Sequence, residues 1–490
     1  MPVLKGKELR IVGFLCNWCS YGGADTAGVG RFAQPTDLRI IRVPCSGRID
    51  PLFVVKALLN GADGVLVSGC HPRDCHYAQG NFYARRRLEV LKRFLPVLGI
   101  DPARFEYTWV SASEGQRWQK VVTSFTGRIH TLGRAPRHAD ADLSLARAAA
   151  ARSHPAADRP RLPGKAQNGA GIEALKERIK AELPGLDCVI GWQQGFDAIH
   201  HTPLFMRSPE DVDRLVWGPL NAHNPATYLA AMRERKVGLV VKGCDSRSVV
   251  ELLQEKLVSR DRVTLFGMPC SGVADLSKVH RALRSSGADP DRVDAVAVEG
   301  ETLTVTVNGT SHPMAMADVA AEKCLHCRFP NALEADCFVG DPLVPAAIAE
   351  SPPADLAALD AMSLQERMAF WRSQMERCIR CHACRNACPL CVCKDHCVAQ
   401  SRDPHWISQE DTVTEKLFFQ VVHAVHLAGR CTECGECARA CPMDIPLVAL
   451  KSHMNRAILD LFEYRAGTDP QAVPPLLTFQ VEEKRINEGD

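Results

Sequence analysis

Seven cysteines lie within twenty positions of this chain, in the stretch CIRCHACRNACPLCVCKDHC at residues 378–397. The first four follow the spacing C-x2-C-x2-C-x3-C and precede Pro389, and the same spacing recurs at residues 431–441 before Pro442. Cysteines this close together are poorly suited to disulfides between distant segments and well suited to holding metal. The doubled spacing is typical of paired [4Fe–4S] clusters, in which the fourth cysteine of each run binds the cluster of the other.

The two runs therefore predict two cubic clusters that exchange their fourth ligands. We assign one cluster to Cys378, Cys381, Cys384 and Cys441, and the other to Cys431, Cys434, Cys437 and Cys388. Zinc knuckles would use C-x2-C pairs and not triplets with a proline behind the fourth cysteine. Because no catalytic residues lie between the two runs, the predicted chemistry is electron conduction.

Three further cysteines, Cys391, Cys393 and Cys397, follow the first run and exceed what two cubes need. They could pack as unliganded thiols. We favour an additional cluster, completed by one thiolate from elsewhere in the chain, such as Cys244 or Cys337.

Five cysteines near the amino terminus form a third group. Each follows a predicted strand of an alternating strand–helix pattern, at the sheet edge where open α/β folds build their sites. Their positions in glycine-containing loops argue against ordinary buried core cysteines. We predict one cluster with four of the five as ligands: Cys16 and Cys19 in CNWCSYGGAD, Cys45 in VPCSGRIDP, and Cys70 and Cys75 in GCHPRDCHY.

These three motifs closely resemble the delta subunit of methyl-viologen-reducing hydrogenase across nearly all of residues 8–133. The resemblance implies a [2Fe–2S] cluster that passes electrons from a hydrogenase or a formate dehydrogenase to the flavin-bearing subunit of heterodisulfide reductase. Spacing alone does not settle which four cysteines bind. We favour Cys19, Cys45, Cys70 and Cys75, with Cys16 as the spectator because it closes a strand and can point inward.

A second family resemblance lies in residues 186–345, in VVKGCDSRS, GMPCSGVAD and EKCLHCRFPNALEADCFVGDP. The last two motifs resemble the iron–sulfur core of the beta subunits of deazaflavin-reducing hydrogenases and related formate dehydrogenases. The resemblance implies a [4Fe–4S] cluster on Cys270, Cys324 and Cys327, with Cys337 or Cys244 as the fourth ligand. That family also binds flavin, so FAD is a possible cofactor, although the flavin residues have no clear counterparts in this sequence.

The remaining pattern predicts two doubly wound α/β domains followed by a mainly α-helical domain with two [4Fe–4S] clusters. Helical periodicity before each cysteine run makes the last domain resemble the α-helical ferredoxin of succinate dehydrogenase and of small heterodisulfide reductase subunits. The expected divisions are a [2Fe–2S] domain at 1–133, an Ala-, Arg- and Pro-rich linker at 134–168, a beta-subunit-like domain at 169–345, a ferredoxin domain at 365–465, and a tail at 466–490.

Overall composition limits the possible partners. Lys and Arg total 59 against 57 Asp and Glu, so no net charge favours nucleic acid or an anionic membrane. No apolar run is long enough for a membrane span, and the amino terminus lacks a signal-peptide pattern. With 22 cysteines in cluster-like spacing, we expect a protein of a reducing, anaerobic cytoplasm.

No nucleophile–base pair, P-loop or dinucleotide fingerprint is recognisable, and GGADTAGVG interrupts a cysteine loop without the order of such a fingerprint. The sequence therefore predicts an electron-transfer subunit with three or four cubes and one [2Fe–2S] cluster. Its partners would be a formate dehydrogenase or hydrogenase and a flavin-containing heterodisulfide-reductase-like subunit. The alternative is a flavin-containing oxidoreductase subunit linked to deazaflavin or NAD(P).

Overall fold

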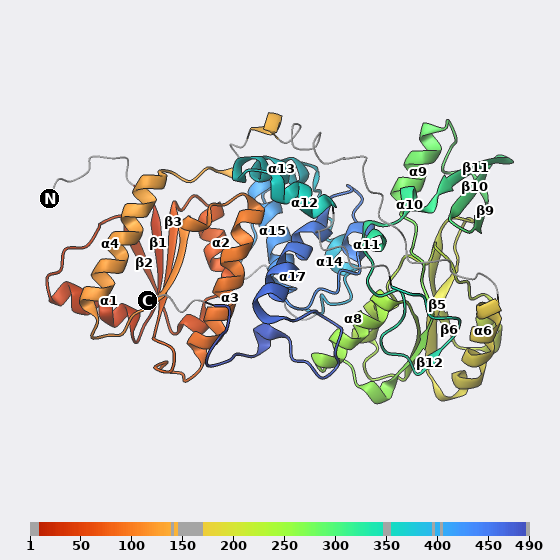
Figure 1. Ribbon diagram of the computed structural model, residues 1–490, viewed down its shortest axis with the longest axis horizontal. Coiled ribbons are helices and arrows are strands. Elements are labelled where there is room, and N and C mark those ends of the chain that lie inside the picture. The colour runs from red at the N-terminus through yellow and green to blue at the C-terminus, as the bar shows by residue number, and fades with distance from the viewer. Residues whose placement is uncertain are drawn as a thin grey trace.

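The computed structural model describes residues 9–138, 142–145, 170–345, 354–393, 397–401 and 405–486. Figure 1 shows three bodies in a row, with an α/β body at each end and a helical body between them. The helical body is built from the carboxyl-terminal part of the chain. The order of the bodies in space therefore differs from their order in the sequence.

The first α/β body is a four-stranded parallel sheet of order β2-β1-β3-β4. Helices cover both faces, because alternate residues of β1 pack on opposite sides: Phe14 joins one hydrophobic core and Leu15 the other. The strands confirm the predicted alternation of strand and helix. The elements are β1 (Ile11–Cys16), α1 (Ser20–Val29), β2 (Leu38–Val43), α2 (Pro51–Leu59), β3 (Gly64–Gly69), α3 (Gly80–Phe94), β4 (Phe105–Trp109) and α4 (Gly115–Leu132).

Helix α1 corrects one interpretation of the sequence, in which SYGGADTAGV belonged to a cysteine loop. A Cβ atom on Gly22 would lie 3.0 Å from the Cβ of Ala112, and one on Gly23 would lie 2.7 Å from the carbonyl oxygen of Ser111. The glycines therefore let the helix approach the loop after β4 closely. Their role is close packing and not loop flexibility.

The second α/β body holds a five-stranded sheet of order β12-β8-β7-β5-β6, in which β6 runs antiparallel to β5 and the other neighbours are parallel. The antiparallel strand lies at one edge, so this sheet is mixed. Its elements are α6 (Ala170–Glu182), β5 (Cys188–Gln194), β6 (His201–Met206), α7 (Pro209–Asp213), β7 (Val237–Val241), α8 (Gly243–Gln254), β8 (Val263–Gly267), α9 (Leu276–Ser285) and β12 (Cys337–Phe338).

A small antiparallel sheet is attached to this second body, with the order β11-β10-β9. Strands β9 (Val293–Glu299) and β10 (Thr302–Val307) form a hairpin. The third strand is β11 (Thr310–Ala315). It contains Pro313, which is unfavourable inside a sheet and is tolerated here because β11 is an edge strand.

The central body is helical, as the sequence predicted, and it shares a hydrophobic core with the first α/β body. Trp371 is fully buried and its indole nitrogen donates to the carbonyl oxygen of Val97 at 2.8 Å, while Trp406 stacks on Phe53. The elements are α12 (Ala354–Ala361), α13 (Leu364–Arg377), α14 (Ala383–Asn386), α15 (Val413–His426), α16 (Glu436–Arg439) and α17 (Leu447–Phe462), with two further short helices, α10 (Met316–Val319) and α11 (Glu322–Leu325), leading to it from the second body.

The opposite side of the central body packs on the second α/β body. Leu390 and Leu427 belong to a hydrophobic core that also contains Leu239 and Leu252 of the second body. Across this junction Arg247 donates to the carbonyl oxygen of Thr432 at 2.9 Å. The central body is thus fixed to a different neighbour on each side.

The segment after α17, for which the sequence predicts no particular structure, contacts all three bodies in turn. The side chain of Gln254 in α8 donates to the carbonyl oxygen of Ala472 at 2.9 Å, and Pro475 lies against Gly429. Further on, Arg86 of α3 donates to the carbonyl oxygen of Pro475 at 2.7 Å, and Phe479 stacks on Phe82. We call residues 466–483 the strap.

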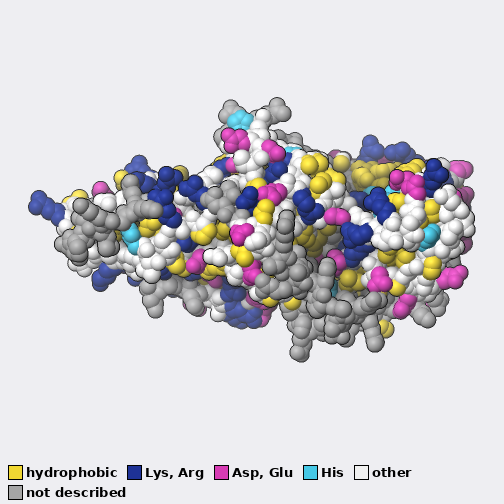
Figure 2. Space-filling model, turned by 90° about the horizontal axis from the view of Figure 1, so that it is seen from above, with side chains coloured by type: hydrophobic (Ala, Val, Ile, Leu, Met, Phe, Trp, Pro, Cys, Tyr) yellow, Lys and Arg dark blue, Asp and Glu magenta, His cyan; other side chains and the backbone are white. Residues whose placement is uncertain are grey.

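Most of the predicted linker 134–168 lies outside the described residues. Among the helices that are described, none is both long and apolar enough for a bilayer crossing. On the face shown in Figure 2, basic and acidic side chains are interspersed along the whole length of the molecule.

The strap generates a prediction about pH. Glu251 of α8 is fully buried and accepts a hydrogen bond from the backbone nitrogen of Gly467 at 3.1 Å; burial, with a contribution from Glu255, raises its pKa to about 8. The pKa of a glutamate in the unfolded chain is about 4.3. Between this pKa and the folded one, the free energy of unfolding falls by up to about 1.4 kcal/mol per pH unit, and it levels off above pH 8. Glu251→Gln keeps the acceptor and removes this titration.

Thermal unfolding of the variant and the parent across pH 6–8.5 measures the effect. We expect the midpoint of the parent to fall with rising pH more steeply than that of Glu251→Gln. Parallel curves would show that Glu251 is ionised in the folded chain.

Candidate metal centres

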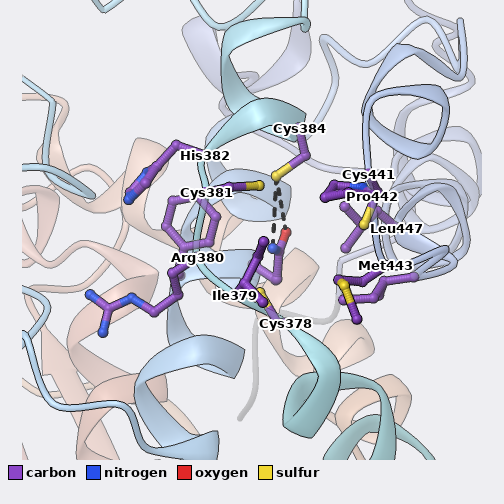
Figure 3. Close-up of a pocket in the computed structure, with 13 residues that line it drawn as sticks. Cys378, Ile379, Arg380, Cys381, His382, Cys384, Cys441, Pro442, Met443 and Leu447 are labelled. Atoms are coloured by element: carbon purple, nitrogen blue, oxygen red, sulfur yellow. Dashed lines mark hydrogen bonds between the residues drawn. The ribbon is translucent and has the colours of Figure 1, made fainter.

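One of the two predicted cubic sites is a cavity in the central body. It has a volume of about 310 Å³ and is lined by four cysteines, three from the first run and one from the second. Figure 3 shows their side chains around this cavity. The four are those assigned from the spacing: Cys378, Cys381, Cys384 and Cys441.

The rest of this cavity is largely apolar. Ile379, Phe419 and Leu447 contribute to its wall, and the amide nitrogen of Gln420 lies 3.8 Å from the sulfur of Cys384. The guanidinium of Arg380 is directed away from the sulfurs in Figure 3 and donates to the carbonyl oxygens of Ser408 and Glu410. We call this the first cube site.

The backbone of the two cysteine runs is strained in the same way. Arg380 and His382 in the first run have φ angles of 50° and 61°, and the equivalent residues Glu433 and Gly435 have 56° and 75°. Left-handed conformation is costly for residues other than glycine. Its repetition at matching positions indicates that both loops are shaped to turn successive cysteines toward one centre.

The second cube site is buried deeper and contains a cation. The sulfurs of Cys431, Cys434, Cys437 and Cys388 influence one another electrostatically, and burial raises the pKa of the Cys431 thiol to about 12. Lys451 of α17 lies beside three of these cysteines, and its side chain is buried. Burial works to lower the pKa of Lys451, but the thiolates of Cys437, Cys388 and Cys431 outweigh this and raise it.

The sequence analysis missed Lys451, although a signal was present. It lies four residues after Leu447 and three before Met454, both buried on the same face of α17. A lysine within an apolar helical stripe requires an anionic partner inside the fold.

A third group of cysteines lies where the second α/β body meets the central body. Cys270 follows β8, Cys324 is in α11, and Cys327 follows it; burial raises the pKa of Cys270 to about 12, and the nearby Cys324 adds to the rise. The backbone nitrogen of Val273 lies 3.3 Å from the sulfur of Cys324 and donates to it. Such a donor stabilises a thiolate.

The two candidates for the fourth ligand of this group lie in different surroundings. Cys244 lies in the first turn of α8 close to Cys270, whereas Cys337 is in β12 and packs against the core that contains Trp192 and Met268. The loop after Cys327 presses closely on the start of α8, because a Cβ on Gly243 would lie only 1.8 Å from the carbonyl oxygen of Phe329. This approach brings Cys244 to the group. We call the set Cys244, Cys270, Cys324 and Cys327 the junction site.

The five amino-terminal cysteines converge as the motifs predicted. The sulfurs of Cys45 and Cys75 are 3.7 Å apart, and those of Cys16 and Cys70 are 3.6 Å apart. Cys19, which caps the start of α1, is also beside Cys70. The sulfur of Cys16 therefore lies with the group, and the hydrogen bond with Cys70 lowers the pKa of Cys16.

The surplus cysteines also lie near one another. Burial raises the pKa of the Cys391 thiol, and Arg385, Cys393 and Cys397 are its nearest charged or ionisable neighbours. Cys244, a suggested fourth ligand for this group, lies at the junction site instead. Cys188 is a buried residue of strand β5.

Within the described ranges, no three His, Cys, Asp or Glu side chains meet closely enough to hold one metal ion. A cubic cluster instead spreads its thiolates around a hollow, as in the first cube site. The all-thiolate donor sets suit iron–sulfur clusters. In the amino-terminal group the fit is tight, because a Cβ on Gly80 would lie 2.4 Å from the sulfur of Cys45.

Comparison with known proteins finds a family model that matches part of each body. Residues 11–133 match the model of the methyl-viologen-reducing hydrogenase delta subunit. They are 53% identical over 126 residues to the iron-sulfur subunit of the vhc F420-non-reducing hydrogenase of Methanococcus voltae, covering 26% of this chain and 88% of that protein. The chain belongs to this delta-subunit family. Its other bodies match further models: residues 234–355 the carboxyl terminus of the coenzyme F420 hydrogenase/dehydrogenase beta subunit, and residues 374–445 a 4Fe-4S dicluster domain.

Two further relatives are similar to the first α/β body of this chain. The iron-sulfur subunit of the F420-non-reducing hydrogenase of Archaeoglobus profundus is 50% identical over 126 residues, covering 26% of this chain and 92% of that protein. A subunit of the ferredoxin:CoB-CoM heterodisulfide reductase of Methanosarcina mazei is 49% identical over 123 residues, covering 25% of this chain and 16% of that protein. The delta module thus occurs alone and as part of a longer subunit.

The close approach at Gly80 gives a prediction. Gly80→Ala places a methyl group against the sulfurs of Cys45 and Cys75, so we expect loss of the amino-terminal cluster and of its paramagnetic signal. Gly28→Ala is the matched control, because a Cβ there meets nothing within 4 Å. An intact signal in Gly80→Ala would show that Cys45 does not hold the cluster.

Iron content tests the surplus cysteines. Three cubes and one [2Fe–2S] cluster require about 14 iron atoms per chain, and a fourth cube raises this to about 18. We expect about 18 for anaerobically purified protein, falling by about 4 when Cys391 and Cys393 are both changed to Ser. A value of about 14 in the parent, unaltered in the double variant, would identify these cysteines as unliganded.

Proposed function

We propose that this chain is a multi-cluster iron–sulfur electron-transfer subunit that relays electrons from one α/β body to the other through the central helical body. The observation that carries the proposal is the position of the helical body. It lies between the two α/β bodies and shares one hydrophobic core with each of them. Although the ferredoxin-like segment is last in the sequence, it is the connection in space.

The two cube sites are oriented along this line. Cys378 and Cys384 of the first cube site belong to the core shared with the first α/β body, as does Cys437 of the second, whereas Cys388 and Cys431 of the second pack against the core shared with the second α/β body. At the far junction the Nζ atom of Lys323 donates to the carbonyl oxygen of Cys434 at 2.5 Å. Lys323 is the neighbour of Cys324, so one residue joins the second cube site to the junction site.

The proposed cofactors follow the cysteine groups. One [2Fe–2S] cluster is held by Cys19, Cys45, Cys70 and Cys75, and three cubes occupy the two cube sites and the junction site, the last on Cys244, Cys270, Cys324 and Cys327. A fourth cube involves Cys391, Cys393 and Cys397. Each cluster supplies one-electron transfer when bound, and the protein positions its thiolates, excludes water and sets the surrounding charge. Boundaries near residues 133, 169, 345 and 365 divide the chain accordingly.

The proposed partners come from the relatives. The delta module occurs in a hydrogenase subunit and within a heterodisulfide reductase subunit, so we infer that the first body exchanges electrons with a heterodisulfide-reductase-like flavoprotein. The second body, related to the coenzyme F420 hydrogenase/dehydrogenase beta subunit, would face a formate dehydrogenase or hydrogenase. The flavin-containing alternative is not favoured. Exposed thiolate clusters require a reducing environment, so we place the protein in the cytoplasm.

The test interrupts the relay in its middle. Cys437→Ser removes one ligand of the second cube site, and Cys188→Ser changes a buried cysteine of β5 that lies in none of the cysteine groups. After mixing with a reduced partner from the native complex, rapid-freeze paramagnetic resonance follows each cluster. We expect the parent and Cys188→Ser to reduce the clusters of both outer bodies, and Cys437→Ser to reduce only those on the donor side.

Iron analysis establishes that the outer clusters survive in Cys437→Ser before the kinetics are compared. Equal rates of reduction at both ends in Cys437→Ser and the parent would contradict a relay through the central body.

A further inference from the structure

The surroundings of the two cube sites differ in buried positive charge. Lys451 is only 4% exposed, and in the described part of the chain its Nζ atom has no hydrogen-bond partner among nitrogen and oxygen atoms. The charged groups that act on it most strongly are Cys437, Cys388 and Cys431 of the second cube site, and Cys437 also forms a hydrogen bond with it. An unpaired buried ammonium is costly, so anionic sulfur is the partner that explains its presence.

A second ammonium approaches the same site from the opposite body. Lys323 donates to the carbonyl oxygen of Cys434 at 2.5 Å, and its Cδ atom lies 2.9 Å from where a Cβ on Gly435 would be. Cys244, Cys324 and Cys434 are among its closest charged neighbours. Lys323 therefore lies between the second cube site and the junction site.

The acidic groups around the second cube site do not cancel these charges. Glu436 is buried, but Arg439 neutralises it through hydrogen bonds of 2.8 and 3.0 Å. Glu433 acts on Cys431 as a further negative charge, and Arg247 lies near both. The net local charge from protein side chains other than the cysteines is positive.

Lys451 also acts on Cys384 of the first cube site, but the described lining of that cavity contains no lysine. Its wall is apolar apart from the cysteines and Gln420, His382 and Arg380. The Arg380 guanidinium points away from the sulfurs, and the His382 ring packs edge-on against Phe419. Two neighbouring sites with equal ligand chemistry therefore have unequal electrostatic surroundings.

We propose that Lys451 and Lys323 raise the reduction potential of the second cube above that of the first, so that electrons entering the central body come to rest on the second cube. One-electron reduction adds a negative charge to the cluster, and a nearby fixed cation stabilises that reduced form. In a buried, low-dielectric site this attraction is stronger than in water. The inference rests on the proposed function, which assigns clusters to both sites.

The two lysines differ in the clusters whose reduction potentials they affect. Lys451 of α17 acts mainly on the second cube, through Cys437, Cys388 and Cys431, and it also acts on Cys384 of the first cube site. Lys323 acts on the second cube and on the junction cluster together. Removal of the Lys323 charge should therefore lower the potentials of the second cube and of the junction cluster, and removal of the Lys451 charge should lower the potential of the second cube most.

A potentiometric titration of the whole, anaerobically purified chain tests the proposal. Paramagnetic resonance follows each cluster, and the signal that is lost in Cys437→Ser identifies the second cube. In the parent we expect the second cube to be reduced before the first. Lys451→Met should shift the reduction equilibrium of the second cube at least tenfold toward the oxidised form, about 59 mV for one electron. Lys451→Arg, which keeps the charge, should restore most of this shift.

Lys416→Met is the matched control, because Lys416 is also buried in a helix of the central body but pairs with Asp411 at 2.8 Å. It should leave every potential unchanged. If Lys451→Met fails to fold, Lys323→Met carries the test at the less buried junction, with a downward shift in both the second cube and the junction cluster.

An unchanged potential of the second cube in both methionine variants, with iron content intact, would overturn the charge assignment while leaving the relay in place. A parent chain that shows no cubic-cluster signals would overturn the proposed function itself. A second cube that is reduced after the first in the parent would also overturn the inference.

Discussion

The exchange of fourth cysteines between the two runs is the constraint on which the central body depends. Cys441 comes from the second run but lines the cavity of the first cube site, and Cys388 comes from the first run but lies with the second. Neither site is complete without both segments. The intervening helix α15 is therefore held between two crossings, which explains how short helices and irregular loops form a body rigid enough for large neighbours to pack against.

Burying so many sulfur atoms requires compensation in charge and in space. Left-handed residues at matching positions of both runs direct successive cysteines toward one centre. The glycines at positions 80 and 243 prevent steric overlap beside the cysteine groups. The buried ammonium of Lys451 compensates the negative charge of the thiolates. These features are dispersed along the sequence, but all are adjacent to cysteine groups in the fold, which is consistent with functional sites storing local strain.

Sequence spacing predicted the features that depend on local geometry. The two cysteine runs, the strands that precede Cys45 and Cys70, and the helices before each run all follow from short-range patterns. The approach of the loop at Phe329 to the start of α8, beside Cys244, did not, because it depends on packing between segments that are distant in the sequence. The helix α1 was missed because glycines suggest a loop when the neighbour that requires close approach, Ala112, is distant in sequence. The spatial order of the three bodies was likewise hidden, since it results from packing between surfaces.

The two sides of the central body use separate hydrophobic cores, one with residues of the first α/β body and one with residues of the second. Substitutions that reshape one interface need not disturb the other. Each outer body can therefore change at its own interface while the central body is retained. The separate occurrence of the delta module in the relatives agrees with such recombination of parts.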